Sequence, residues 1–129
     1  MAKVGLVLSG GMAKGAYQLG ALRAISELFA PEEFSLISCS SIGTLNGYAF
    51  AMRRLRQAEE MWLGLCEANP RQSIGHVLRS AFLQQGIGSI CSADDTVPTR
   101  CYTTFLDIGK RQLTYFNCSR RSQAPYRII

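Results

Sequence analysis

The chain has 129 residues, 47% of them hydrophobic, enough for one domain with a core and too few for two, so we expect residues 1–129 to form a single domain. No apolar run approaches the roughly 18 residues of a membrane span, and the N-terminal run is too short for a secretion signal, so we expect a soluble, cytoplasmic chain. The net charge of +5 is concentrated after Thr96 without a nucleic-acid motif, which favours a solvated face, or one that meets acidic chain, over a nucleic-acid partner.

Two strand and helix pairs are expected in the first part of the chain. The apolar run 3–9 predicts a central strand covered on both faces, and apolar residues at helical spacing predict a helix over 16–29. A second strand is predicted at 34–39. Apolar residues at positions i, i+3, i+4 and i+7 then predict a helix that begins just after Ser41.

The second half is predicted to add helices and a hairpin. Residues 57–66 continue in a helical pattern, and 74–84 form a further short helix. We interpret the arginines just before the first of these helices as charges that favour the C-terminal end of the preceding one. Residues 86–98 are rich in glycine, serine and aspartate and predict a loop. The runs 100–106 and 111–116, rich in Thr, Tyr, Phe and Leu, predict a β-hairpin.

The cysteines give no sign of a metal site or a disulfide framework. There are five, at irregular spacings and without a C-x-x-C pair, and His76 is the only histidine. This pattern favours reduced, mostly buried thiols. We expect no metal and no cofactor.

Ser41 is the candidate nucleophile. It lies where an apolar strand stops and a helix begins, and a serine on such a tight turn lifts its hydroxyl above the sheet edge. Small residues two before and two after let strand and helix pass closely; Gly43 fills the second position, whereas Cys39 occupies the first. The alternative is that Ser41 is only the N-cap of the helix, because serine is a favoured capping residue.

The glycine-rich loop 10–15 is the second candidate site. A glycine turn between a buried strand and a helix presents free backbone N–H groups at the positive end of the helix dipole, which suits an anion. Either a bound phosphate or the oxyanion of an ester reaction is compatible. The phosphate-loop pattern is not met, because Ala16 and Tyr17 stand where it needs lysine and serine or threonine. A dinucleotide fingerprint lacks its middle glycine at Met12, although a nucleotide-binding α/β module remains an alternative.

The residues Leu8 to Gln18, followed by Ser40 to Gly47, resemble the patatin-like phospholipase family. In that family an S-G-G-G-x-K/R-G loop supplies the oxyanion hole and a G-x-S-x-G elbow carries the nucleophile. The hairpin segment 103–109 is similar to a later strand pair of the family. The positions that match the two main motifs are Gly10, Gly11, Lys14, Gly15, Ser41 and Gly43.

The resemblance implies an α/β fold of the three-layer α/β/α type with a mostly parallel central sheet, incomplete in this chain. It implies hydrolysis of phospholipid or other lipid esters by a serine–aspartate dyad, with Ser41 as nucleophile and transient contact with a membrane surface. The oxyanion hole would be formed by Gly10, Gly11 and Met12, the last in place of a third glycine. Lys14, Gly15 and Gly43 would support these motifs.

The family's aspartate lies in a D-G-G or D-G-A motif, which is absent from residues 1–129. Either the chain is the N-terminal portion of a longer acyl hydrolase, or it is a short inactive relative that binds lipid or a partner. We expect the first.

Overall fold

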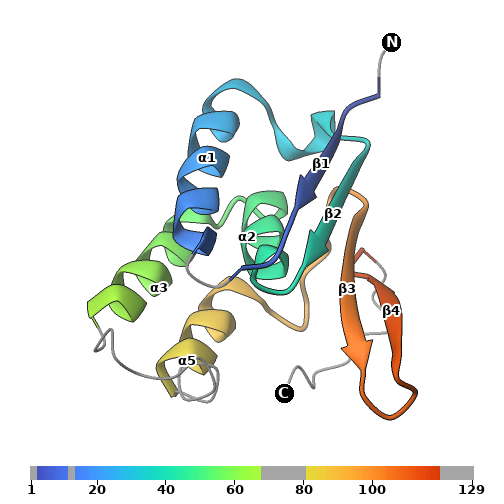
Figure 1. Ribbon diagram of the computed structural model, residues 1–129. Helices are drawn as coiled ribbons and strands as arrows, with labels where there is room; N and C mark the ends of the chain where they lie inside the picture. Colours follow the sequence, from blue (N-terminus) through green and yellow to red (C-terminus); the bar gives the residue numbers. More distant parts are fainter. Residues whose placement is uncertain (1–2, 12–13, 68–80, 120–129) are drawn as a thin grey trace.

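The computed structural model describes residues 3–11, 14–67 and 81–119, which form a sheet with helices packed against it (Figure 1). The strands are β1 (Gly5–Leu8), β2 (Leu36–Ser40), β3 (Cys101–Asp107) and β4 (Gln112–Asn117). The helices are α1 (Gly15–Leu28), α2 (Ile42–Ala51), α3 (Leu55–Glu67) and α5 (Ala81–Ile90), with a short 3₁₀ turn, η2, at Pro31–Glu33. In the part of the chain so described, no helix is long and apolar enough to cross a membrane.

The sheet has the order β1-β2-β3-β4 and is mostly parallel. β1 pairs with β2 and β2 with β3 in parallel, whereas β3 and β4 form an antiparallel hairpin. The hairpin extends past the ends of β1 and β2 (Figure 1), because residues after Thr104 pair only with β4. The predicted α/β class, the incomplete mostly parallel sheet and the hairpin are therefore confirmed.

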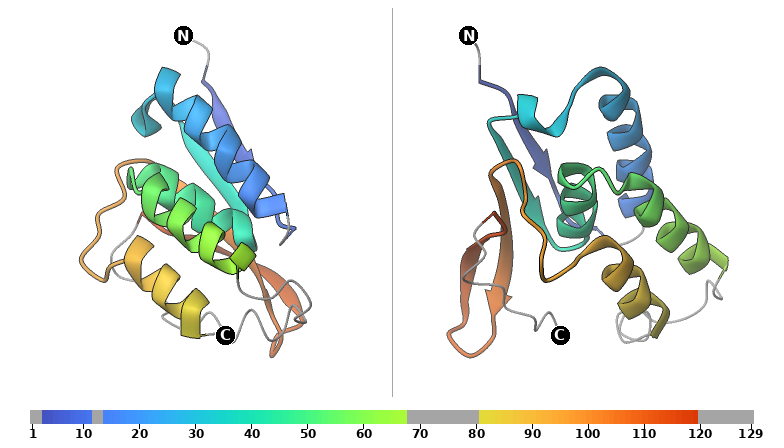
Figure 2. Two further views of the ribbon diagram at one scale, coloured as in Figure 1. Left: turned by 90° about the vertical axis from the view of Figure 1, so that its left-hand side faces the viewer. Right: turned by 180° about the vertical axis from the view of Figure 1, so that it is seen from behind.

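The helices α1, α2, α3 and α5 all lie on one side of the sheet (Figure 2). On that side Ile37, Cys39 and Cys101 are 0–2% exposed. The expectation that the first strand is central and covered on both faces is wrong within the described residues: β1 lies at one end of the strand order, and Val7 is 78% exposed while Leu8 is 5% exposed. Alternate side chains of a strand point to opposite faces, so one layer of helices buries only every second residue.

The prediction of a loop from residue 86 is also wrong, because α5 continues to Ile90. A glycine stands inside this helix because α3 packs closely against it: a Cβ atom at Gly86 would be 2.4 Å from Cγ of Met61. Such an approach of two helices needs a residue without a side chain. Of the helix expected over 74–84, residues 74–80 lie outside the described part.

Candidate active site

Ser41 is the single residue between β2 and α2, and its backbone has an unusual conformation. Its φ of 53° and ψ of −129° lie where residues other than glycine are rarely found. The residue is exposed, and no capping hydrogen bond is formed by its side chain. Ser41 is thus the N-cap residue of α2, as the alternative expects, but its side chain forms no capping hydrogen bond. The turn presents the Ser41 hydroxyl at the carboxyl edge of the sheet.

The turn is sharp because α2 starts directly against β1. A Cβ atom on Gly43 would lie 2.5 Å from the carbonyl oxygen of Leu8 and 2.9 Å from that of Ser9. Any side chain at this position would push the helix away from the strand, since real Cβ atoms do not approach oxygen so closely. Gly43 therefore has the packing role that the sequence predicts for it.

Cys39 occupies the position where the family pattern has glycine, and the structure shows what makes room for its side chain. A Cβ atom on Gly47 would lie 2.3 Å from Sγ of Cys39, so the missing side chain one turn further along α2 accommodates the sulfur. The Cys39 side chain is 2% exposed and belongs to the core. The absence of a side chain at Gly47 thus lets α2 pack against β2 with the Cys39 sulfur between them.

The glycine loop lies beside Ser41. A Cβ atom on Gly10 would be 2.8 Å from Cβ of Ser41 and 3.5 Å from its Oγ, so only glycine fits here. Gly11 has a φ of 128°, and its carbonyl oxygen accepts a 2.7 Å hydrogen bond from the backbone N–H of Lys14, the N-cap residue of α1. The structure thus brings Gly10 next to Ser41, while Met12 lies outside the described residues.

Gly15 and Trp62 join the start of α1 to α3. Gly15 is buried, and a Cβ atom there would be 2.1 Å from Cζ2 of Trp62. The indole therefore fills the space beside the first turn of α1. Gly15 supports the loop through helix packing.

A buried asparagine, which the sequence does not single out, connects these elements. Asn46 in α2 is 0% exposed, and its Oδ1 accepts a 3.0 Å hydrogen bond from Nε1 of Trp62. Its Nδ2 donates to the carbonyl oxygen of Gly15 at 2.8 Å and to Oε1 of Gln18 at 3.0 Å. Gln18 in turn donates from Nε2 to the carbonyl oxygen of Ser9 at 3.1 Å. Three of these hydrogen bonds form a chain from Trp62 in α3 to Ser9, the residue before Gly10, and the fourth joins Asn46 to Gly15.

All nine acidic residues lie in the described part of the chain, and none of them forms a hydrogen bond with the Ser41 hydroxyl. Asp95 is fully engaged elsewhere: Nη1 and Nη2 of Arg54 donate to it at 2.6 Å, and the Tyr48 hydroxyl and the Ser92 N–H donate at 2.8 Å. The hydrogen bonds from Arg54 lower the pKa of the Asp95 carboxyl to about 2. Asp107 in the hairpin accepts a bond from the Lys110 N–H.

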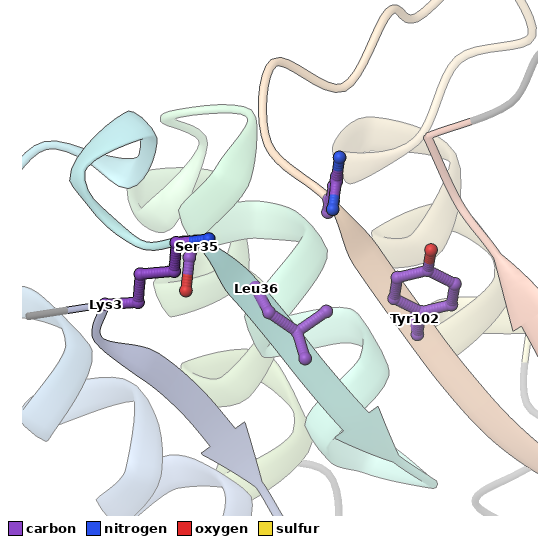
Figure 3. Close-up of a pocket in the computed structure, with 5 residues that line it drawn as sticks. Lys3, Ser35, Leu36 and Tyr102 are labelled. Atoms are coloured by element: carbon purple, nitrogen blue, oxygen red, sulfur yellow. The ribbon is translucent and has the colours of Figure 1, made fainter.

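A pocket of about 510 Å³ lies away from this site (Figure 3). It opens where β1, β2 and β3 begin, whereas Ser41 follows the carboxyl end of β2. Its position at the opposite ends of the strands separates it from the Ser41 hydroxyl. The lining residues are Lys3, Ser35, Leu36, Arg100 and Tyr102.

The comparisons with known proteins give one match. The family described as Patatin-like phospholipase matches residues 6–117, which run from β1 through the glycine loop and the Ser41 turn to the end of β4. No curated protein and no solved structure matches the chain. Since the match covers most of the sequence, the chain belongs to the patatin-like phospholipase family.

Proposed function

We propose that the protein is a serine acyl hydrolase that cleaves ester bonds of phospholipids or other lipids, with Ser41 as its nucleophile. The observation that carries the proposal is the strained, exposed turn at Ser41 with Gly10 packed against its side chain. Strain of this kind persists only where the surrounding structure holds it, and it recurs at reactive residues. The family, whose members are typically lipid hydrolases, gives the class of substrate.

In the proposed reaction Oγ of Ser41 attacks the carbonyl carbon of the ester and loses its proton. The carbonyl oxygen becomes an oxyanion, which accepts hydrogen bonds from the backbone N–H groups of Gly10, Gly11 and Met12. The bond to the alcohol then breaks, and the alcohol leaves with a proton, so that an acyl-serine remains. Water hydrolyses this ester and restores the hydroxyl. Backbone donors aimed at the oxyanion are commonly the largest electrostatic contribution, each worth about 10² to 10³ in rate.

The proton of Ser41 needs an acceptor, and the resemblance assigns this role to an aspartate. No carboxylate among the described residues contacts Ser41. This observation favours a second candidate function, a patatin-like domain without catalysis that binds lipid or a partner. The two candidates differ in whether Ser41 reacts.

For either candidate we also propose a cytoplasmic location, with transient contact with a membrane surface where lipid is presented. Neither needs a metal or another cofactor. For the hydrolase, turnover of a lipid ester should persist in the presence of EDTA.

The deciding experiment is reaction of the full-length natural chain with a fluorophosphonate, followed by mapping of the labelled residue. The hydrolase predicts labelling at Ser41 that disappears in Ser41→Ala and persists in Ser40→Ala, a matched change one residue away. Hydrolysis of a lipid ester should follow the same pattern. Binding to lipid vesicles without labelling of Ser41 would instead support the non-catalytic domain.

A further inference from the structure

The hydrogen bonds between Trp62 and Ser9 have only one possible direction. The Trp62 indole can only donate, so the Asn46 atom that faces it must be the amide oxygen. The Asn46 NH₂ group therefore faces Gly15 and Gln18. The Gln18 atom that meets this NH₂ group must be Oε1, which leaves its own NH₂ group to donate to the Ser9 carbonyl oxygen.

Each end of this chain of hydrogen bonds is a group with a single role, a donor at Trp62 and an acceptor at Ser9. A rotated amide at either Asn46 or Gln18 would place two donors or two acceptors together. Asn46 is fully buried, so such a mismatch could not be relieved by water. Asn46 thus determines the orientation of the Gln18 amide.

The Ser9 carbonyl is therefore held from two sides. Gln18 donates to its oxygen, and α2 lies so close that even a Cβ atom at Gly43 would be 2.9 Å from that oxygen. In a trans peptide the C=O and the following N–H point in opposite directions in one plane. Holding the Ser9 oxygen in place consequently holds the N–H of Gly10, the residue that packs against Ser41.

We propose that Gln18, oriented by Asn46, is a positioning residue that holds the Gly10 N–H as an oxyanion donor. The inference rests on the proposed function, since it needs Ser41 to react. A loosened donor weakens binding of the oxyanion more than binding of the neutral ester, so the effect falls on kcat rather than on KM. We expect Gln18→Met to lower kcat about 10-fold, less than complete removal of a donor does, because the N–H is still present.

The test compares Gln18→Met with Gln85→Met in the full-length chain. Both are helical glutamines and the substitution is the same, but Gln85 is exposed in α5 and its side chain forms no hydrogen bond with the described residues. Fluorophosphonate labelling of Ser41 should slow about 10-fold in Gln18→Met, with KM for an ester substrate within about twofold of the starting value. Gln85→Met should label at the unchanged rate.

A second readout follows the Gly10 N–H directly. In ¹H–¹⁵N correlation spectra the Gly10 resonance should move in Gln18→Met and stay in place in Gln85→Met. Asn46→Asp, which keeps an acceptor for Trp62 and removes the donors to Gly15 and Gln18, should move it in the same way. Because Gln18 is only partly buried, its substitution leaves the core intact even if the Asn46 variant does not fold.

The outcomes separate the inference from the function on which it rests. Absence of labelling at Ser41 in the unchanged protein overturns the hydrolase and, with it, the role of Gly10 as an oxyanion donor. Labelling at Ser41 with the same rate in Gln18→Met overturns the inference alone. An unmoved Gly10 resonance in Gln18→Met also overturns it, whatever the activity.

Discussion

The two ends of α2 are held in opposite ways. Over its first two turns the helix approaches the sheet because Gly43 and Gly47 lack side chains, and the hydroxyl of Ser41 at its amino end has no hydrogen-bond partner within the described residues. Past its carboxyl end, Arg54 is bound to Asp95, and the same guanidinium donates to the carbonyl oxygen of Ile90 at the end of α5.

This difference separates a polar cluster that stabilises the fold from the exposed hydroxyl that we propose to be the nucleophile. The Asp95 carboxylate accepts hydrogen bonds from Arg54, Tyr48 and Ser92, and these bonds stabilise the fold. Because they also lower its pKa, the carboxylate is a weak base. At the other end, the close packing of Gly43 and Gly47 against the strands holds the elements together, and Ser41 remains exposed.

Removal of the Asp95 charge should have the largest effect on stability. In Asp95→Asn the guanidinium of Arg54, which is 26% exposed, loses its ionic partner, and breaking such a pair from one side typically costs about 3 kcal/mol. Urea unfolding measures the change. The neighbouring Asp94→Asn, at an exposed position, should leave the free energy of unfolding nearly unchanged; an equal loss in both variants would contradict the role given to Asp95.

The same pair predicts how stability depends on pH. The Asp95 pKa of about 2 lies below the usual value near 3.8, so the folded state favours the carboxylate. Its contribution is complete above about pH 5 and is lost as the pH falls towards 2, by about 2 kcal/mol in total. Urea midpoints measured from pH 6 to pH 2 should show the difference between the unchanged protein and Asp95→Asn shrinking. A difference that stays constant over this range would sink the prediction.

A double-mutant cycle tests the close approach at the other end. Gly47→Ala should destabilise the fold by about 2 kcal/mol, because its new methyl group meets the Cys39 sulfur. In the background of Cys39→Ala the same change should cost at least about 1 kcal/mol less, since the sulfur is gone. Gly88→Ala is the matched control: the added atom has no described neighbour within 4 Å, so this change in a helix should stabilise the fold slightly. Additive effects at Gly47 and Cys39 would contradict the contact.

Relief of the backbone strain at Ser41 should give the smallest change in the free energy of unfolding, and this change should be stabilising. Glycine adopts a φ of 53° without penalty, so Ser41→Gly should be more stable than Ser41→Ala by about 1 kcal/mol. Thermal unfolding of the two variants, neither of which retains the hydroxyl, measures the difference. Equal stability would indicate that the turn is not strained.

The sequence predicts those features that depend on neighbouring residues. The turn at Ser41 and the hairpin are of this kind, because strand, turn and helix signals lie side by side along the chain. The site contacts missed by sequence reasoning join distant residues: Gln18 meets Asn46 28 positions away, and Arg54 meets Asp95 41 positions away. The sequence offers one signal for these contacts, which is the asparagine at position 46 among the apolar residues of a helix. Such an amide needs hydrogen-bond partners when the helix is buried.

The errors in the fold have the same origin. A short apolar strand cannot reveal whether one face or two will be covered, and Val7 proves to be exposed. Gly86 looks like a loop residue in the sequence, yet its place in α5 is explained by Met61, which is distant in the chain. The residue pattern of one strand or helix does not specify which other element will pack against it.

The order in which the site residues occur has a consequence for synthesis of the chain. The glycine loop, the Ser41 turn and the hydrogen bonds from Trp62 to Ser9 all come from residues 9–62, whereas β3, the next neighbour of β2, begins at Cys101. Since a chain emerges from the ribosome at about 5–20 residues per second, these parts are available to one another for seconds before β3 exists. The elbow and its supports can therefore assemble first, and the hairpin is added to a preformed edge of β2.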